Sequence, residues 1–432
     1  MSDLDLSTPP APAERTWTTP DVFWPSLSAA TARLDPPLAV LHLPALRHNA
    51  HDLLRRAAGA AGTDRPTKAI RVASKSVRVR AVMDAVLALP GYAGVLAYTL
   101  PEALWLAEGD AEHPPIEDVV VGYPTADRAA IARLAASPEL AARVTLMVDS
   151  VAHLDFIDAV VPPAQRETIR LCLELDSSWF APVLGHVGVF RSPLHSAAAV
   201  RTVAEEIARR PGFALVGMMG YEAQIAGQGD NPPGKPAWGA TLRWMQKNSR
   251  DELLGRRGEA VAAVRRIADL EFVNGGGTGS IEFTASDESV TEIAAGSGLF
   301  GGHLFDTYRA FHPAPAASFA LSVVRRPNAG TATLLGGGWI ASGPPGPDRM
   351  PKVEWPTGLS MVAREMAGEV QTPLTGAAAG VLRIGDRVWL RHTKSGELSE
   401  HVDGFQLVDT VDGRARVVGE AATYRGDGKV FL

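Results

Sequence analysis

Lys75 and a glycine-rich run at 275–279 are the residues of this sequence whose types and positions could do chemistry. Lys75 stands within Ala-Ile-Arg-Val-Ala-Ser-Lys-Ser-Val-Arg at 69–78, where an apolar strand ends and a helix begins. The run Gly-Gly-Gly-Thr-Gly lets backbone N–H groups approach a phosphate closely. A lysine amine in its neutral form condenses with an aldehyde. Together the two features predict pyridoxal 5'-phosphate as the cofactor. The run lacks the Gly-Lys-Ser/Thr ending of a nucleotide loop, which disfavours nucleotide hydrolysis.

Composition limits the compartment and the partners. The 432 residues are 46% hydrophobic and 21% charged, with a formal net charge of −6 and no basic block, so we expect no nucleic-acid partner. The single cysteine, Cys172, lies in an apolar run, so an intrachain disulfide is impossible and a reducing, cytoplasmic compartment is favoured. No stretch approaches the ~20 apolar residues of a membrane span. Residues 1–35, rich in Pro, Ala and Thr, do not resemble a signal peptide and are expected to form a flexible N-terminal extension.

The middle of the chain alternates short apolar runs with amphipathic helical segments, which is the pattern of repeated βα units. Eight strands are expected, so the pattern predicts an α/β fold with a closed (β/α)8 barrel of the TIM type, spanning residues 36–310. The expected strands are 69–74, 93–98, 118–122, 144–148, 168–175, 213–220, 271–274 and 290–294. The expected helices are 78–89, 102–108, 126–136, 151–160, 195–209 and 241–268.

Residues 311–432 show a different pattern, in which apolar segments typical of strands alternate with Gly/Pro turns. This pattern predicts a β-rich C-terminal domain. Its expected strands are 319–324, 331–336, 385–390, 406–410, 416–419 and 422–424. The apolar segment within 36–43 is expected to pair back into this domain. The connection 341–360 is expected to be a long loop, and such loops are often functional.

Barrel active sites lie at the carboxyl ends of the strands, where the candidate residues also fall. Lys75 follows the first strand, Tyr221 and Gln224 follow the sixth, 274–278 follow the seventh and 296–298 follow the eighth.

The order of these features resembles the alanine-racemase-type (fold type III) pyridoxal phosphate enzymes, and within them the group containing D-threonine aldolase and D-serine dehydratase. The resemblance covers most of 38–410. It rests on the segment 38–49, Ala-Ser-Lys-Ser at 73–76, Gly-Tyr-Glu-Ala-Gln at 220–224, Asn-Gly-Gly-Gly-Thr-Gly at 274–279, Thr-Glu-Ile-Ala-Ala-Gly-Ser-Gly at 291–298 and Asp-Thr-Tyr at 306–308.

The resemblance implies roles for particular residues. Lys75 matches the lysine that binds the cofactor covalently, and Tyr221 matches a tyrosine of the pocket. Both are expected to be catalytic residues. Tyr308 lies in a segment that borders the pocket, and Glu292 aligns with a polar residue whose role stays open. The residues expected to contact the cofactor are Lys75, Tyr221, Gln224, Asn274, Gly276, Gly277, Thr278, Gly296 and Ser297.

The sequence departs from the family at two places. After the fifth strand, relatives have a short Asp-x-Gly-x-x-Arg-x-Gly motif, whereas the longer segment 176–191 here puts either His186 or Arg191 near the expected arginine. Relatives also carry His-x-Asp or His-x-Cys as metal ligands in the second domain, but here His392 is followed by Thr393 and Lys394. An ammonium group has no lone pair to offer a metal.

A shifted metal site is the alternative to a lost one. His401-Val-Asp lies close by in the sequence, so a divalent metal (Mn, Mg or Zn) held by His392, His401 and Asp403 is one hypothesis. A solvated acidic turn is the other. In relatives the metal and its histidine assist the base at the substrate's β-hydroxyl, so His392 or His401 is the expected base.

The resemblance implies a lyase that cleaves a D-β-hydroxy amino acid by a D-threonine aldolase-like retro-aldol reaction. Its alternatives are β-elimination, as in a D-serine dehydratase or deaminase, and racemisation, for which Tyr308 is the candidate second base. A non-catalytic pyridoxal phosphate-binding protein is the hypothesis from another class. The expected partners are a small amino-acid substrate and a second copy of the chain in a homodimer, with no membrane.

Overall fold

The structure is a computed structural model that describes residues 4–59, 67–182 and 184–432. Residues 1–3 of the expected extension lie outside the described part. The chain forms two compact units. The first, here called the sheet unit, contains Met1–Asp52, Lys75–Leu89 and Ser297–Val430. The second, the barrel unit, contains Leu53–Ser74, Pro90–Gly296 and Phe431–Leu432.

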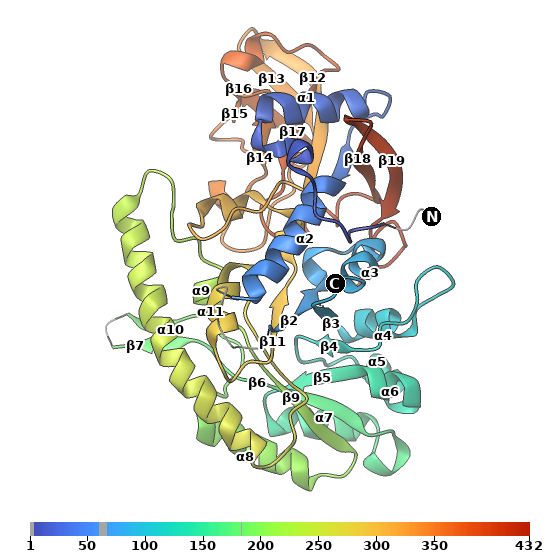
Figure 1. Cartoon of the computed structure of the whole chain (residues 1–432), viewed down its shortest axis with the longest axis vertical. Helices are drawn as coiled ribbons and strands as arrows, with labels where there is room; N and C mark the ends of the chain where they lie inside the picture. The colour runs from blue at the N-terminus through green and yellow to red at the C-terminus, as the bar shows by residue number, and fades with distance from the viewer. Residues whose placement is uncertain (1–3, 60–66, 183) are drawn as a thin grey trace. The chain divides into compact units, whose positions relative to one another are not determined.

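The barrel unit contains the predicted closed barrel (Figure 1). Its strands follow one another in the order β10-β11-β2-β3-β4-β5-β6-β9, and every neighbouring pair is parallel. The predicted (β/α)8 fold is therefore confirmed. The strands are β2 (Ala69–Ala73), β3 (Tyr92–Ala97), β4 (Val119–Val121), β5 (Val144–Val148), β6 (Ile169–Glu174), β9 (Phe213–Gly220), β10 (Phe272–Gly275) and β11 (Glu292–Ala295).

Helices follow the barrel strands as the apolar spacing predicts, and polar residues fix their starts. The side chain of Thr99 caps α4 by accepting from the backbone of Glu102, and Asp127 caps α5 in the same way. The long helix α10 packs along α8 (Figure 1). The helices are α4 (Leu100–Glu108), α5 (Arg128–Ala136), α6 (Pro138–Arg143), α7 (Val151–Val160), α8 (Ala197–Arg209), α9 (Ala223–Ala226), α10 (Pro236–Arg265) and α11 (Ile281–Ser286).

Apolar side chains from successive strands fill the barrel interior. The buried cluster consists of Leu96, Val120, Met147, Cys172, Val216, Met219, Phe272 and Ala294. Burial raises the pKa of the Cys172 thiol well above its usual value. Cys172 therefore packs in the core as a protonated, unreactive thiol. A packed interior leaves the loops at the ends of the strands as the place for a site.

The sheet unit is built on a nine-stranded sheet with the main order β15-β16-β13-β12-β1-β18-β19, and β17 pairs with both β12 and β14. Strand β1 pairs antiparallel with β12 and parallel with β18, so the segment at 38–42 lies inside this sheet. The strands are β1 (Leu38–His42), β12 (Ala317–Asn328), β13 (Thr331–Leu335), β14 (Lys352–Trp355), β15 (Ser360–Met361), β16 (Gln371–Thr375), β17 (Arg387–Arg391), β18 (Gly404–Val411) and β19 (Arg414–Ala422).

Some expected details of this unit were wrong. The expected loop at 341–360 contains β14 and the start of β15, and the strand β16 was not predicted because it is short and contains a proline. The two strands expected at 416–419 and 422–424 are one strand, β19, which a bulge against β18 bends. The unit also contains α2 (Leu43–Ala57) in part, α3 (Arg80–Leu87) and α12 (Ser297–Phe300).

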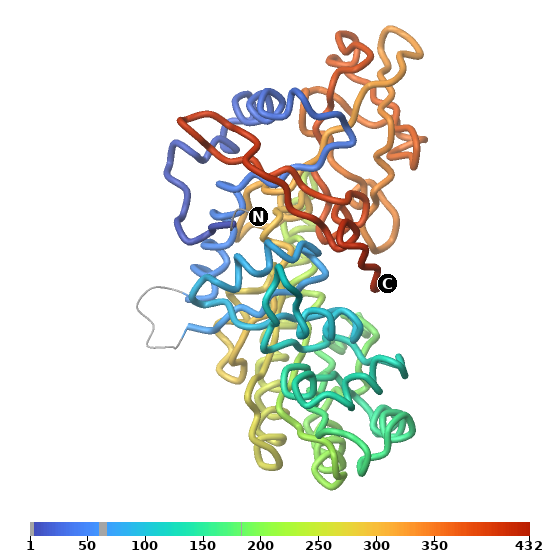
Figure 2. Tube along the Cα trace, turned by 90° about the vertical axis from the view of Figure 1, so that its right-hand side faces the viewer, coloured from blue at the N-terminus to red at the C-terminus, as the bar shows by residue number. Residues whose placement is uncertain are grey.

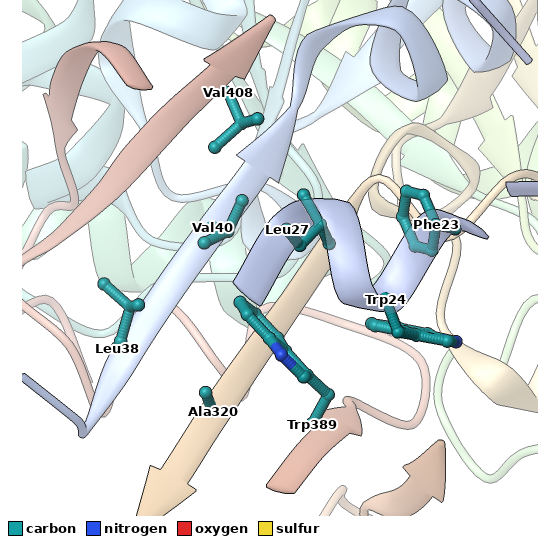
Figure 3. Close-up of a cluster of buried hydrophobic side chains, with 8 residues drawn as sticks. All are labelled: Phe23, Trp24, Leu27, Leu38, Val40, Ala320, Trp389 and Val408. Atoms are coloured by element: carbon teal, nitrogen blue, oxygen red, sulfur yellow. The ribbon is translucent and has the colours of Figure 1, made fainter. Parts of the chain in front are cut away.

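The expectation of a flexible extension at 1–35 fails for its second half. Residues Pro20–Ala30 form helix α1, which buries Phe23, Trp24 and Leu27. These side chains pack on strand residues from both ends of the chain (Figure 3). In Figure 2 the blue N-terminal trace runs beside orange and red segments of its own unit, in agreement with the pairing of β1 with β12 and β18. Pro25 within the helix and the Pro/Ala/Thr-rich surroundings masked its apolar face in the sequence. No helix in the described residues has the length and apolar run needed to cross a membrane.

Candidate active site

The carboxyl ends of β2, β11, β10 and β9 are neighbours on one rim of the barrel, because these strands follow one another in the sheet order. Lys75 comes two residues after β2, in the single turn η3 (Ser74–Ser76). The hydroxyl of Ser74 donates to the carbonyl oxygen of Leu96 at 3.1 Å and fixes the end of β2 against β3. The side chain of Lys75 is half-buried. The strand order thus brings the end of β2, which the Ser74–Lys75 pair directly follows in the sequence, and the ends of β10 and β11 to one edge of the barrel.

The glycines of the two loops are required by their surroundings. Gly276 has φ +84°, and a methyl group there would lie 2.7 Å from Oγ1 of Thr284. A methyl group on Gly277 would lie 3.2 Å from the ring of Tyr221, and one on Gly296 would overlap the carbonyl oxygen of Ala73. The loop after β10 runs into the turn η5 (Thr278–Ser280) and α11. This backbone can present N–H groups to an anion.

Glu222 braces the glycine loop, and sequence reasoning assigned it no role. Its carboxylate accepts hydrogen bonds from the backbone of Gly276 at 3.1 Å and from the hydroxyl of Thr284 at 2.7 Å. Arg257 donates to it at 3.4 Å and to Asp287 at 2.8 Å. All these charged side chains are buried. The only signal in the sequence was an acid between the two predicted site residues Tyr221 and Gln224.

Tyr221 lies beside the loop, under an arginine. The guanidinium of Arg191 stands 5.1 Å from the centre of the Tyr221 ring and 5.4 Å from that of Tyr123. Burial raises the pKa of Tyr221 to about 12, although Arg191 opposes the shift, so the phenol keeps its proton. His186 instead stacks on Phe190 at 4.2 Å. Of the two candidates that the sequence offered, Arg191 is the one that lies over Tyr221.

Gln224 and Asn274 make structural hydrogen bonds. The amide of Gln224 donates to the carbonyl oxygen of Ser177 at 2.7 Å and to Ser249 at 2.8 Å. Asn274 donates to Glu292 at 2.8 Å. Glu292 in turn accepts from Arg71 at 2.7 and 2.9 Å, which gives it the role that the sequence left open. Within the described residues, Oε1 of Gln224 and Oδ1 of Asn274 are buried without a hydrogen-bond partner.

The remaining predicted site residues are Thr278 in the barrel unit and Ser297 and Tyr308 in the sheet unit. Thr278 is buried, and its carbonyl oxygen accepts from Arg56 at 2.7 Å. Ser297 begins α12, directly after Gly296. Tyr308 is buried against Phe305 and Phe311, with ring centres 5.5 and 5.1 Å away.

A group of acids at the same barrel edge was not predicted. Glu174 ends β6, and burial raises its pKa to about 7, with Asp149 and Asp176 adding to the shift and Arg191 opposing it. Asp176 also contacts His195 at 3.1 Å. Glu174 can therefore be protonated or ionised near neutral pH.

Pyridoxal phosphate fits the residues of this edge. An amine follows one strand, and loops in which Gly276 and Gly296 have no room for a Cβ follow two other strands of the barrel. The anion cradle and the amine are the two protein groups that this cofactor needs.

His392 lies at the end of β17, in the sheet unit. Its ring is buried, and neither ring nitrogen has a hydrogen-bond partner of normal geometry within the described residues. Burial lowers its pKa to about 4, against the opposing influence of Glu397, so the imidazole is neutral at physiological pH. Glu397 uses its carboxylate to accept from the backbone N–H groups of Thr393, Lys394 and Ser395, each at 2.8 Å.

The predicted metal site is not assembled. No group of three or more His, Cys, Asp or Glu side chains in the described parts of the chain could hold a metal ion. His401 stacks on Trp339, with ring centres 5.1 Å apart, and Asp403 pairs with Arg425 at 3.0 Å. Lys394 replaces the second ligand of the relatives' motif, and Glu397 is occupied by backbone groups. The residues present therefore do not fit a divalent ion at His392.

The turn that carries Lys394 packs on the Lys75 segment, within the sheet unit. A methyl group on Gly396 would overlap the carbonyl oxygen of Lys75, and the hydroxyl of Ser399 donates to the carbonyl oxygen of Val77 at 2.8 Å. Glu400 pairs with Arg78, which donates to the same Lys75 carbonyl oxygen at 2.9 Å. The turn is thus fixed against the lysine that the sequence singled out.

The architecture is that of the alanine-racemase-type enzymes, so the expected resemblance is confirmed at the level of the fold. A D-threonine aldolase from Filomicrobium marinum shares it with a TM-score of 0.70 and 20% identity, over 93% of this chain and 97% of that one. A D-threo-3-hydroxyaspartate dehydratase from Delftia sp. HT23 shares it with a TM-score of 0.64 and 18% identity, over 90% of this chain and 97% of that one.

Sequence comparison adds one kind of relative. A 3-hydroxy-D-aspartate aldolase from Paracoccus denitrificans is 30% identical over 227 residues, which are 52% of this chain and 51% of the aldolase. The chain therefore matches about half the length of the curated relative. No family model matches the sequence.

Proposed function

We propose that this chain is a pyridoxal phosphate-dependent lyase that cleaves a D-β-hydroxy amino acid into an aldehyde and glycine. The observation that carries the proposal is the lysine after β2 on the same barrel rim as the glycine loops after β10 and β11. The aldolase names of the sequence relative and of one structure with this fold support the retro-aldol reaction.

In this proposal Lys75 holds the cofactor covalently, and the loops that contain Gly276, Gly277, Thr278, Gly296 and Ser297 surround its phosphate. The N–H groups of Gly276 and Gly277 donate to Glu222 and Ser280, so other backbone N–H groups of these loops bind the phosphate. Bound pyridoxal phosphate supplies an electron sink for the bond broken at the α-carbon. Tyr221 borders the phosphate loop as a neutral phenol, and Arg191 stands over its ring.

A proton acceptor at the β-hydroxyl is also needed for the retro-aldol cleavage. His392 stays our proposed base, because it is a neutral imidazole whose ring nitrogens make no hydrogen bond of normal geometry within the described residues. Gln224 and Asn274 remain proposed cofactor contacts through their unpaired oxygen atoms. We also infer a cytoplasmic homodimer in which the barrel spans residues 36–310 and the β-rich domain spans residues 311–432.

β-Elimination is the second candidate, since the dehydratase from Delftia sp. HT23 has the same fold. Racemisation is less well supported, because Tyr308, its expected second base, is packed among phenylalanines.

Product analysis separates these reactions. Cofactor-loaded protein is incubated with a panel of D- and L-β-hydroxy amino acids that includes D-threonine and 3-hydroxy-D-aspartate. We expect aldehyde and glycine from D-isomers. Formation of 2-oxo acid and ammonia alone would replace the proposal with the elimination, and the mirror-image amino acid would replace it with racemisation.

Covalent attachment is tested separately. We expect borohydride to fix the cofactor on the peptide that contains Lys75, and the Lys75→Ala variant to lose this label and at least about a thousandfold of the activity. Lys352→Ala is the matched control, because Lys352 is an exposed lysine paired with Asp306 at 3.0 Å. A label that persists in Lys75→Ala contradicts the assignment.

A further inference from the structure

Lys394 and Arg349 are two cations on segments that contact each other, and the turn with Lys394 also contacts the Lys75 segment. Neither cation has a role so far. Lys394 is half-buried, and in the residues that the structure describes no hydrogen-bond or ion-pair acceptor contacts its ammonium group. The guanidinium of Arg349 is largely buried, and its Nε and Nη1 have no hydrogen-bond partner there. Its nearest acid, Asp348, stands 3.7 Å from Nη2.

Backbone contacts hold the two residues together. The hydroxyl of Thr393, next to Lys394, donates to the carbonyl oxygens of Arg349 at 3.1 Å and of Met350 at 3.2 Å. The ring of His303 contacts the same carbonyl oxygen of Met350 at 2.8 Å. The segment that carries Arg349 is therefore tied to the segment that carries Lys394, and the latter is tied to Lys75 through Gly396.

The positive charges of Lys394 and Arg349 are not balanced by acidic side chains among the described residues. Glu397 is engaged by three backbone N–H groups, and the one ion pair of the Arg349 side chain among the described residues is the long contact with Asp348. Buried donors without partners are costly unless a ligand satisfies them. An anion placed between Lys394 and Arg349 would do so.

We propose that Lys394 and Arg349 bind a carboxylate on the side chain of the substrate, in the place where relatives hold a divalent metal. Lys394 occupies the position of the relatives' second metal ligand, and that metal acts at the β-carbon side of the substrate. A guanidinium and an ammonium suit a carboxylate, because both donate charge-assisted hydrogen bonds. The inference rests on the proposed function, and it makes this chain a metal-independent lyase selective for β-hydroxy amino acids with a second carboxylate.

Two substrates that differ in the side-chain carboxylate test the pair. kcat/KM is measured with 3-hydroxy-D-aspartate and D-threonine for the cofactor-loaded wild type, Lys394→Gln and Arg349→Gln, with Lys352→Gln as the control. We expect each site variant to lose about 10-fold to 100-fold with the dicarboxylate, mainly through KM, and less than about threefold with D-threonine. Arg349→Lys should recover part of the loss. Equal losses on both substrates, or none on the dicarboxylate, overturn the proposal.

A binding measurement tests the carboxylate site independently of the proposed reaction. The cofactor absorbance is titrated with D-aspartate and D-alanine, which lack the β-hydroxyl. We expect tighter binding of D-aspartate, lost in Lys394→Gln. If the wild type cleaves neither hydroxy amino acid but shows this preference, the proposed function fails and the carboxylate site stands. If it cleaves them and the variants are unaffected, the carboxylate site fails alone.

Chelation tests the metal-independent part of the inference. Extended treatment with a chelator should leave kcat/KM for 3-hydroxy-D-aspartate within about twofold of the untreated value, since no ion holds the substrate. A loss of activity that Mn²⁺, Mg²⁺ or Zn²⁺ restores would overturn it.

Discussion

At the scale of single residues, backbone conformation decides whether the phosphate loop can form. Gly276→Ala puts a methyl group 2.7 Å from Oγ1 of Thr284 at a φ of +84°. We expect the free energy of unfolding to fall by about 1–3 kcal/mol and the affinity for the cofactor to fall by about tenfold or more. Thermal unfolding and equilibrium titration with pyridoxal phosphate measure the two effects.

Gly255→Ala is the matched control for this substitution. Gly255 lies inside α10, and nothing stands within 4 Å of its added Cβ. The helix should gain roughly 0.5–1 kcal/mol of stability with no change in cofactor affinity. Equal effects of the two substitutions would contradict the requirement for glycine at 276.

At the scale of elements, helix α1 belongs to the core of the sheet unit. Leu27 is fully buried in the cluster that joins α1 to strands β1, β12, β17 and β18, so Leu27→Ala should cost about 2–5 kcal/mol. Val22 on the same helix is 51% exposed, and Val22→Ala should change stability by less than about 0.5 kcal/mol. Denaturant unfolding of both variants decides between a docked helix and a loose extension, for which Leu27→Ala would be neutral.

At the scale of the whole molecule, the two units should respond to acid in opposite directions. His42 and His392 in the sheet unit have pKa values lowered to about 4 by burial, so their unfolded forms bind more protons below pH about 6.5. Stability of this unit is therefore lost as the pH falls through that window. Glu174 in the barrel unit has a pKa raised to about 7, so the folded state binds more protons, and acid stabilises this unit down to about pH 4.5.

Native-state hydrogen exchange at about pH 5 and about pH 7, corrected for intrinsic rates, measures this difference. Each group contributes about 1.4 kcal/mol per pH unit within its window. Glu174→Gln should flatten the response of the barrel unit and leave that of the sheet unit unchanged. A common shift of both units would contradict the assignment.

Most of the fold prediction came from the spacing of apolar residues along the sequence. The eight barrel strands agree with the structure to within about two residues, because a strand buried on both faces reads as a continuous apolar run between turn signals. Lys75 and the glycine loops were found for a related reason, since their positions relative to strand ends are local facts. Helix α1 was missed because Pro25 and its Pro/Ala/Thr-rich surroundings hide an apolar face that only tertiary contacts reveal.

By itself, the sequence determined the barrel, the order of its strands and the edge at which a lysine and two glycine loops meet, because these follow from local periodicity and from the parallel closure of the strands. The tertiary structure decided everything that depends on distant segments. It placed Arg191 over Tyr221 and bound Glu222 to the glycine loop. Within the described residues it left His392, His401 and Asp403 in no metal-binding group, and it joined the segment of Arg349 to that of Lys394. Charges interact through space, so no spacing along the chain could have revealed which of them share a site.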